Sequence, residues 1–188
     1  MAVEIQQLTV EQYLALEAES EIRREFIDGE IFPMTGGTGN HGAIIAYTIA
    51  ALVNLLEDTD CVVRASTVRV KIDEFTYVYP DVSVVCGESV YADDDENHLV
   101  NPTVVVEVTS PSSIERDRVR KVELYGDIPS VQGYLILDQE RVFAQWRTRS
   151  ESGWHLRQFS DLTDEIELEP LGCVLRLADV YRSVKLDA

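Results

Sequence analysis

The stretch Val104-Val105-Val106-Glu107-Val108 decides the interpretation of this sequence. A short, almost continuous run of valine is typical of a strand that is buried on both faces of a sheet. Glu107 places a carboxylate inside that run. A buried carboxylate without a partner costs several kcal/mol or becomes protonated, so Glu107 requires a lysine, an arginine or a metal ion beside it.

A second apolar run, Val78–Cys86, contains an acid of its own, Asp81, directly after Pro80. If these two core strands are neighbours with matching registers, the carboxylates of Asp81 and Glu107 converge on one point. Oxygen ligands of this kind suit Mg²⁺ or Mn²⁺ better than zinc. The two strands therefore predict a divalent metal site.

Lys121 lies on a charged helix predicted over Ile114–Gly126, directly after the Glu107 strand. If this helix folds back over the strand end, the Lys121 ammonium approaches both carboxylates and can orient a water that attacks a phosphorus atom. Two structural alternatives stay open. Lys121 can pair with Asp117, four residues earlier on the helix, and the two strand carboxylates can form a structural network neutralised by nearby cations.

The remaining patterns predict helices and strands along the whole chain, and we interpret residues 1–188 as one α/β domain. A capping box at Thr9 opens a short helix through Ala18, and Asp28-Gly29 predicts a hairpin. Asn40 is expected to cap an amphipathic helix through Leu56. Further strands are predicted near 61–65, 67–72, 133–137 and 172–177, with a helix over 177–184 and a hairpin of 141–147 with 154–159 in which Trp146 and Trp154 face each other.

Acidic residues dominate the charge of the chain. Its 188 residues include 34 Asp or Glu and 16 Lys or Arg, which gives a formal net charge of −18, and 45% of the residues are hydrophobic. This composition excludes a disordered tail, a collagen-like repeat and a membrane bundle. The charge argues against a broad basic face that grips nucleic acid.

The cysteines and the N-terminal segment bear on the cellular compartment. Cys61, Cys86 and Cys173 form no CxxC pair, and we expect reduced, mostly buried thiols. No export signal and no apolar run long enough to span a bilayer is visible. The expectation is a soluble, cytoplasmic protein.

Several segments carry a resemblance to a known family. They are Tyr79-Pro80-Asp81, Glu107-Val108-Thr109-Ser110-Pro111-Ser112, and Asp117-Arg118 followed by Lys121, Tyr125 and Ile128-Pro129-Ser130. These segments resemble the Uma family of bacterial restriction-endonuclease-like proteins, within the PD-(D/E)XK nuclease superfamily. The resemblance extends through Tyr13-Leu14, Glu25, Asp28-Gly29-Glu30 and His41. It implies a restriction-endonuclease-like core, with a mixed twisted sheet flanked by helices.

The resemblance also implies roles for individual residues. Asp81 corresponds to the Asp of the PD element, and Glu107 corresponds to the acidic residue of the (D/E)XK element. The backbone carbonyl of Val108 is then a further metal ligand. Thr109 stands where the superfamily usually has its Lys, and Lys121 on the next helix is the substitute.

The implied function is divalent-metal-dependent hydrolysis of DNA phosphodiester bonds, with Mg²⁺ or Mn²⁺ as cofactor. A nuclease that cuts both strands is expected to be a homodimer. Glu25 and His41 recur in the family's pattern as accessory residues without an assigned role. DNA contact would rest on a few local cations and the metal, so binding is expected to be weak and dependent on salt and metal. Those cations include Arg116, Arg118, Arg120 and Lys121.

Two other functions stay open. One is a catalytically inactive module that keeps the nuclease fold and binds a basic partner protein through its acidic surface. The other is a nucleotide site, because the segment from Gly37 to Gly42 formally reads G-x-G-x-x-G at the start of a helix. That site would need a buried parallel strand before the loop, whereas the sequence predicts a hairpin strand that contains Pro33.

Overall fold

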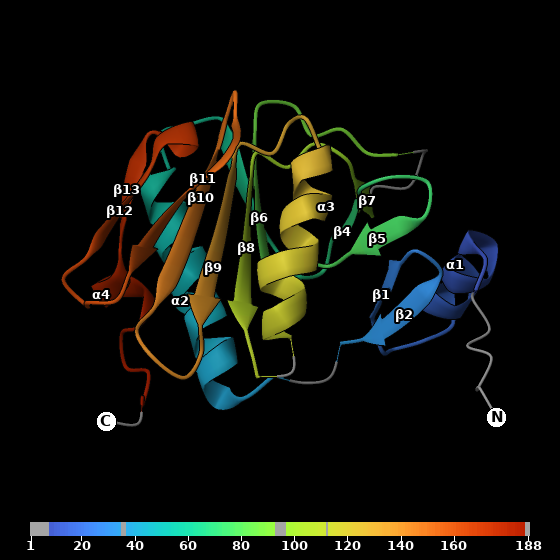
Figure 1. The fold of residues 1–188 in the computed structure, drawn as a ribbon, viewed down its shortest axis with the longest axis horizontal. Coiled ribbons are helices and arrows are strands. Elements are labelled where there is room, and N and C mark those ends of the chain that lie inside the picture. The colour runs from blue at the N-terminus through green and yellow to red at the C-terminus, as the bar shows by residue number, and fades with distance from the viewer. Residues whose placement is uncertain (1–7, 35–36, 93–96, 112, 187–188) are drawn as a thin grey trace.

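The computed structural model describes residues 8–34, 37–92, 97–111 and 113–186. Within these ranges the strands form a six-stranded sheet, a five-stranded sheet and a two-stranded sheet. Figure 1 shows the six-stranded sheet between helices on its two faces, with the five-stranded sheet beside it. This is the expected α/β class, a mixed twisted sheet flanked by helices.

The six-stranded sheet has the order β11-β10-β9-β8-β6-β3. Its central strands β8 and β9 run parallel, and the other neighbours run antiparallel. Every residue of β8 and β9 is buried, as the valine run predicted. The strands are β3 (Cys61–Ala65), β6 (Val82–Cys86), β8 (Val104–Thr109), β9 (Gly133–Asp138), β10 (Ala144–Ser150) and β11 (Gly153–Phe159).

The five-stranded sheet has the order β2-β1-β5-β4-β7. Asp28 and Gly29 both have positive φ, at 53° and 87°, and close the β1–β2 hairpin as predicted. The strands are β1 (Arg24–Ile27), β2 (Glu30–Pro33), β4 (Arg69–Lys71), β5 (Thr76–Val78) and β7 (His98–Leu99).

The chain passes between the two larger sheets at Pro80. The prediction of one continuous apolar run over Val78–Cys86 is wrong, because β5 ends at Val78 and β6 begins at Val82. Proline has no N–H for a ladder hydrogen bond, so the run breaks there. Asp81 consequently lies where the two sheets meet.

Helices cover both faces of the six-stranded sheet (Figure 1). The α2 helix packs against Val104 and Val106, whereas α3 packs against Val105 on the opposite face. The helical segments are α1 (Val10–Ala18), α2 (Gly39–Leu55), the π-helical turn η1 (Arg116–Arg120) with its continuation α3 (Lys121–Asp127), the 3₁₀ turn η2 (Glu169–Leu171) and α4 (Leu177–Val180).

Two helix starts can be compared with expectation. The capping box of Thr9 with Gln12 is present at α1. The expectation that Asn40 caps α2 is wrong. The cap is Thr38, whose side chain accepts the hydrogen bond from the N–H of His41. Asn40 lies inside the first turn and donates to the carbonyl of Lys185 at 2.8 Å.

The β10–β11 hairpin is present, but its two tryptophans do not face each other. Trp146 is registered with Arg157, and Trp154 with Arg149, so the two rings lie on opposite faces. Trp146 is fully buried. The acidic segment after the hairpin forms a strand that sequence analysis missed, β12 (Glu165–Leu168), which pairs with β13 (Cys173–Arg176).

The expectation that all three cysteines are reduced is wrong for two of them. Cys61 on β3 lies directly opposite Cys86 on β6, and the two form a disulfide. Strand pairing brings together residues 25 positions apart, which spacing along the chain did not reveal. Cys173 is a free cysteine. None of the described helices has the length and apolar character needed to cross a membrane.

The contact between Gly133 and Trp146 yields a stability prediction. A Cβ on Gly133 would lie 2.1 Å from the Cη2 atom of Trp146, so Gly133→Ala must displace the ring. We expect this substitution to lower the free energy of unfolding by about 1–3 kcal/mol, measured by urea denaturation. Gly42→Ala is the control, since no atom lies within 4 Å of the added methyl in helix α2. Its stability should be unchanged or higher; equal losses in both variants would contradict the packing argument.

Candidate active site

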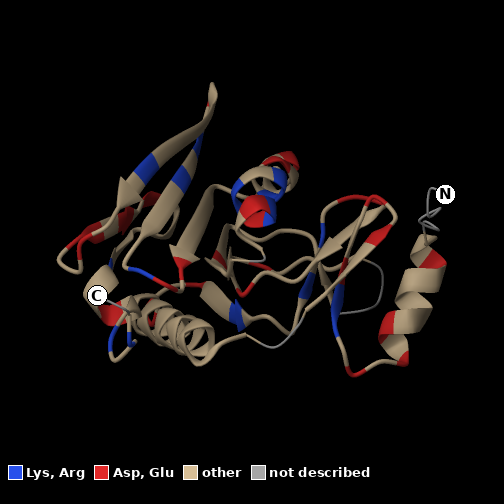
Figure 2. Ribbon diagram, turned by 60° about the horizontal axis from the view of Figure 1, so that its bottom comes forward, with Lys and Arg blue, Asp and Glu red and all other residues tan. Residues whose placement is uncertain are grey.

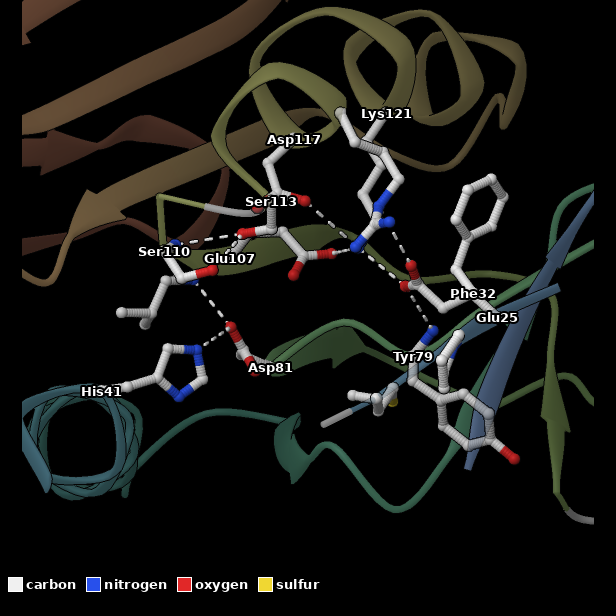
Figure 3. Close-up of a pocket in the computed structure, with 14 residues that line it drawn as sticks. Glu25, Phe32, His41, Tyr79, Asp81, Glu107, Ser110, Ser113, Asp117 and Lys121 are labelled. Carbon is white, nitrogen blue, oxygen red and sulfur yellow. Dashed lines mark hydrogen bonds and ion pairs between the residues drawn. The ribbon is translucent and has the colours of Figure 1, made fainter. Parts of the chain in front are cut away.

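A pocket of about 270 Å³ opens where the two larger sheets meet (Figure 3). Its polar wall comes from strand ends of both sheets, the start of α2 and the η1–α3 segment. Its apolar wall comes from β2 and the residue after it. The lining residues are Glu25, Phe32, Pro33, Met34, His41, Tyr79, Asp81, Glu107, Val108, Ser110, Ser113, Arg116, Asp117 and Lys121.

Asp81 enters the pocket from the junction before β6. The antiparallel pairing of β6 with β8 brings it to the end of β8, where the N–H of Val108 donates to Asp81 Oδ2 at 2.7 Å. His41 Nε2, from the first turn of α2, lies 3.6 Å from the same oxygen. Asp81 is 6% exposed, so these contacts fix a buried carboxylate in one orientation.

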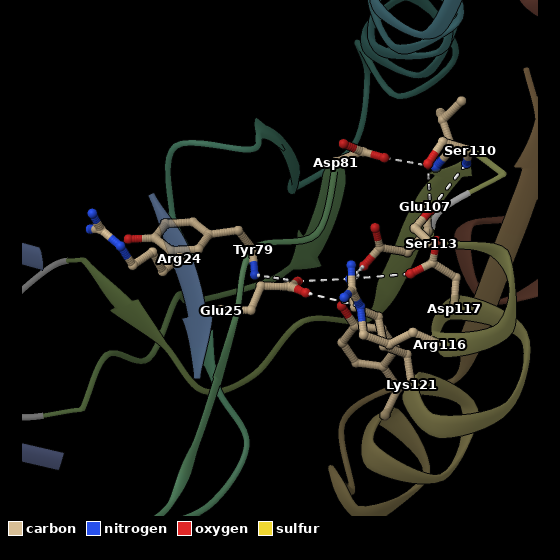
Figure 4. Close-up of polar contacts among 12 residues, drawn as sticks. Arg24, Glu25, Tyr79, Asp81, Glu107, Ser110, Ser113, Arg116, Asp117 and Lys121 are labelled. Carbon is tan, nitrogen blue, oxygen red and sulfur yellow. Dashed lines mark hydrogen bonds and ion pairs between the residues drawn. The ribbon is translucent and has the colours of Figure 1, made fainter. Parts of the chain in front are cut away.

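Lys121 lies between three carboxylates of three different elements (Figure 4). Its Nζ is 2.7 Å from Glu107 Oε1, 2.7 Å from Glu25 Oε1 and 3.5 Å from Asp117 Oδ1. The helix folds back over the β8 end as expected, and the Asp117 pair of the structural alternative is also present. Tyr125, one turn further along α3, donates to Glu107 Oε1 at 2.8 Å.

Glu25 connects the five-stranded sheet to this cluster. It lies on β1 and is 2% exposed. Its Oε1 accepts the N–H of Tyr79 at 3.2 Å, and its Oε2 lies 3.6 Å from Arg116 Nε. The structure therefore gives Glu25, which sequence analysis left without a role, a contact with the same ammonium as Glu107.

Negative charge exceeds positive charge in the pocket. Four buried carboxylates, those of Glu25, Asp81, Glu107 and Asp117, face one buried ammonium and the partly exposed Arg116. A formal count of these groups gives two more negative than positive charges. A divalent cation would balance them, whereas a phosphate alone would add to the imbalance.

Burial and the neighbouring charges together set the direction of the pKa shifts in the pocket. Burial raises the pKa of Asp81, against the opposing effects of His41 and the Val108 N–H. Burial also raises the pKa of Glu107 well above its usual value, and Lys121 only partly opposes this effect. Burial lowers the pKa of Lys121, but Glu107, Glu25 and Asp117 outweigh it, so the pKa lies well above its usual value and the lysine keeps its proton.

The free oxygens of the two strand acids suit a hard cation. Oδ1 of Asp81 and Oε2 of Glu107 receive no hydrogen bond or ion pair from the residues that the structure describes. No group of three or more His, Cys, Asp or Glu side chains in these ranges is arranged as a metal site. An ion would therefore need backbone carbonyl or water ligands as well, and Mg²⁺ retains several waters in its protein sites.

Other residues singled out from the sequence lie outside this arrangement. Thr109 is buried and donates to the carbonyl of Leu137, so it does not take the place of the missing Lys. Arg118 pairs with Asp138 instead of the pocket carboxylates. Arg120 pairs with Asp28 and with Glu30 on the hairpin.

The Gly-rich segment does not have the context of a dinucleotide site. The strand before it, β2, pairs antiparallel with β1 and alternates between half-buried and exposed residues. Gly37 instead lies against the His41 ring, since a Cβ there would be 2.5 Å from Nδ1. This packing supports the position of His41 beside Asp81. The structure around this segment therefore contradicts the alternative of a nucleotide site.

Sequence reasoning missed several pocket residues. Ser110 and Ser113 form the turn after β8, in which the Ser110 N–H donates to Ser113 Oγ at 3.0 Å. Phe32 forms part of the apolar wall and lies under the guanidinium of Arg116, 4.9 Å from the ring centroid. Ser110 was visible in the motif after Glu107, but nothing in that motif indicated that Ser113 or Phe32 would line the same pocket.

The ammonium–carboxylate cluster yields a coupling prediction. Lys121→Met leaves Glu25, Glu107 and Asp117 buried without their shared cation, and we expect a loss of about 3–5 kcal/mol in the free energy of unfolding. Glu25→Gln in the Lys121→Met background removes one of the repelling charges. The double variant should therefore be more stable than the sum of the single losses predicts, by about 1 kcal/mol or more in urea denaturation. Additive losses would show that the two side chains act independently.

Comparison with known proteins bears on the fold and the family of this chain. A structure described as "a putative nuclease belonging to DUF820", from Anabaena variabilis ATCC 29413, has the same fold, with a TM-score of 0.77, 16% identity, and coverage of 93% of this chain and 97% of that one. Two relatives come from Synechocystis sp. (strain ATCC 27184 / PCC 6803 / Kazusa). Uncharacterized protein slr1290 is 31% identical over 179 residues, covering 94% of this chain and 93% of the relative. Uncharacterized protein sll1609 is 34% identical over 134 residues, covering 70% and 75%. Residues 10–178 match the Uma2 family, described as "Putative restriction endonuclease", and the chain belongs to that family.

Proposed function

We propose that this chain is a divalent-metal-dependent endonuclease that hydrolyses DNA phosphodiester bonds. One observation carries the proposal: Asp81, directly before β6, and Glu107, on the neighbouring strand β8, reach one pocket in which carboxylates outnumber cations. Each acid keeps one oxygen free of protein donors. Membership in a family described as "Putative restriction endonuclease" supports this interpretation.

In this proposal Asp81, Glu107 and the carbonyl of Val108 hold Mg²⁺ or Mn²⁺. When bound, the ion lowers the pKa of a coordinated water and stabilises charge on the phosphate. Lys121 positions the attacking water. Its contact with Asp117 is the longest of its three, at 3.5 Å, and we propose that the water approaches the ammonium on this side.

The two accessory residues receive positioning roles. Glu25 holds the Lys121 ammonium from the side opposite to Glu107, and the Tyr79 N–H holds Glu25. His41 lies against the Asp81 oxygen that accepts the Val108 N–H, which leaves the other oxygen free for the ion. Neither residue needs to contact the substrate in order to affect the geometry of the pocket.

The proposal extends to the assembly and the location of the enzyme. A dimer places one such site on each strand of a duplex, so we propose a homodimer of single-domain chains. We also propose a cytoplasmic location, where chromosomal DNA lies; the Cys61–Cys86 disulfide, typical of oxidising compartments, gives no support to it. Size-exclusion chromatography with light scattering measures the assembly directly, and a monomer at working concentration would count against the dimer.

Cleavage assays test the catalytic assignment. Asp81→Asn and Glu107→Gln keep the shape of each side chain and remove its charge, and Lys121→Met removes the ammonium. We expect each to slow cleavage of plasmid DNA in Mg²⁺ or Mn²⁺ by about a hundredfold or more. Glu165→Gln, at an exposed acid on β12, is the control and should cleave as the wild type does. Folding of each variant is checked by thermal melting, and equal cleavage by folded variants and control would reject the site.

Calorimetry tests metal binding without reference to activity. The wild-type chain should bind Mg²⁺ at millimolar concentrations, because the ion neutralises the surplus charge of the pocket, and Asp81→Asn should weaken that binding. Absence of metal binding in this range would favour the inactive module that binds a basic partner protein through its acidic surface.

A further inference from the structure

A group of arginines lies beside the pocket, on the α3 face of the six-stranded sheet. We call Arg118, Arg141 and Arg147 the arginine cluster; they come from η1, the turn after β9, and β10. Asp138 and Phe143 lie between them. Figure 2 shows Lys and Arg on the β10–β11 ribbon and on the η1–α3 segment, within a chain whose net charge is −18.

Two of these arginines share one acid and one aromatic ring. Arg118 Nη2 and Arg141 Nε lie 3.2 Å and 3.3 Å from the same oxygen, Oδ2 of Asp138. Their guanidinium carbons lie 5.2 Å and 4.7 Å from the centroid of the Phe143 ring. Phe143 and Asp138 thus hold two guanidinium groups together that would otherwise repel each other.

Positive charge exceeds negative charge here, unlike in the pocket. Arg118 and Arg141 share one acid, Asp138. Arg147 donates to the neutral side chain of Gln145 at 2.8 Å. Burial lowers the pKa of Arg147, and the nearby Arg118 lowers it further. By contrast, Arg116 lies beside Glu25 in the pocket, and Arg120 pairs with Asp28 on the β1–β2 hairpin. The cluster therefore has unused capacity for an anion.

Strand register places the cluster next to the pocket. Asp138 is registered with Thr109 on the parallel strand, and Glu107 lies two residues earlier with its side chain on the same face. Strand geometry then puts the Cα atoms of Asp138 and Glu107 about 8 Å apart. Arg118 also directly follows Asp117, which lines the pocket.

Arg141 has the exposure that a ligand would require. Its side chain is 63% exposed while its Nε faces Asp138, so its terminal nitrogens are open to solvent. A guanidinium presents several N–H groups in one plane and binds phosphate oxygens in pairs. A phosphodiester fits this cluster better than a carboxylate ligand does, since nucleic acid offers phosphates in series along one strand.

We propose that the arginine cluster binds a phosphate of the nucleic-acid strand, adjacent to the phosphate that lies at Asp81 and Glu107. This inference rests on the proposed function, because it assigns that site its neighbouring subsite. The cluster supplies the local positive charge that lets an acidic protein hold a polyanion. Arg118 and Arg141 make the contacts, and Asp138 with Phe143 acts as their support.

The experiment compares Arg141→Ala with a matched control. Arg176→Ala removes an equally exposed arginine, 66% accessible, whose Nε lies 3.2 Å from Glu165 on the β12–β13 pair. Both changes are made in the Glu107→Gln chain to prevent turnover. Binding of a fluorescent duplex oligonucleotide is measured with Mg²⁺ at several salt concentrations.

Arg141→Ala should weaken oligonucleotide binding about five- to tenfold. It should also reduce the slope of the logarithm of the binding constant against the logarithm of the salt concentration by the amount expected for about one phosphate contact. Arg176→Ala should change neither the affinity nor this slope. Arg141→Lys should restore the salt dependence but only part of the affinity, because an ammonium does not form the paired contact. Equal binding by the two alanine variants, or no binding by the parent chain, would overturn the inference.

Wild-type cleavage separates the two proposals. If Arg141→Ala weakens binding but the wild-type chain cleaves no DNA, the phosphate subsite stands and the nuclease proposal fails. If the wild type cleaves and the two alanine variants, made in the wild-type chain, have the same KM for the oligonucleotide, the nuclease proposal stands and the subsite fails.

Discussion

The Lys121 ammonium is the interaction on which the arrangement of the pocket depends. It contacts Glu25 on β1, Glu107 on β8 and Asp117 on η1, and so joins the five-stranded sheet, the six-stranded sheet and the helical segment at one buried point. Removing a single cation from such a cluster leaves charges that the protein interior cannot solvate. Conversely, the three acids hold the lysine in one position, which an exposed lysine would not keep.

Charge is distributed unevenly in this acidic chain. The pocket concentrates carboxylates beyond what its cations balance, and Asp81 and Glu107 keep free oxygens there. The adjoining face of the sheet has the opposite surplus, around Arg118 and Arg141. A metal ion in the first region and a phosphate in the second would relieve both surpluses. The net charge of the chain argues against binding to nucleic acid, but it does not reveal this uneven distribution of charge.

The break at Pro80 connects the fold to the site. Because proline cannot continue the ladder, β5 ends and β6 begins in a different sheet, and Asp81 is left at the junction with its side chain held by the Val108 N–H. The disulfide between Cys61 and Cys86 lies at the opposite end of the β3–β6 pair. Strand β6 thus takes part in one expected contact, through its pairing with β8, and in one unexpected bond, through its pairing with β3.

Local chemistry in the sequence determined the α/β class, the β1–β2 hairpin at Asp28-Gly29, the buried strand around Glu107 and the need of that acid for a partner. These follow from short-range patterns: period, turn residues, and the cost of burying a charge. Strand order, registers and helix placement bring together residues far apart in the chain. Only the tertiary structure decided that Glu25 would share Lys121 with Glu107, that Cys61 would meet Cys86, and that arginines would gather beside the pocket.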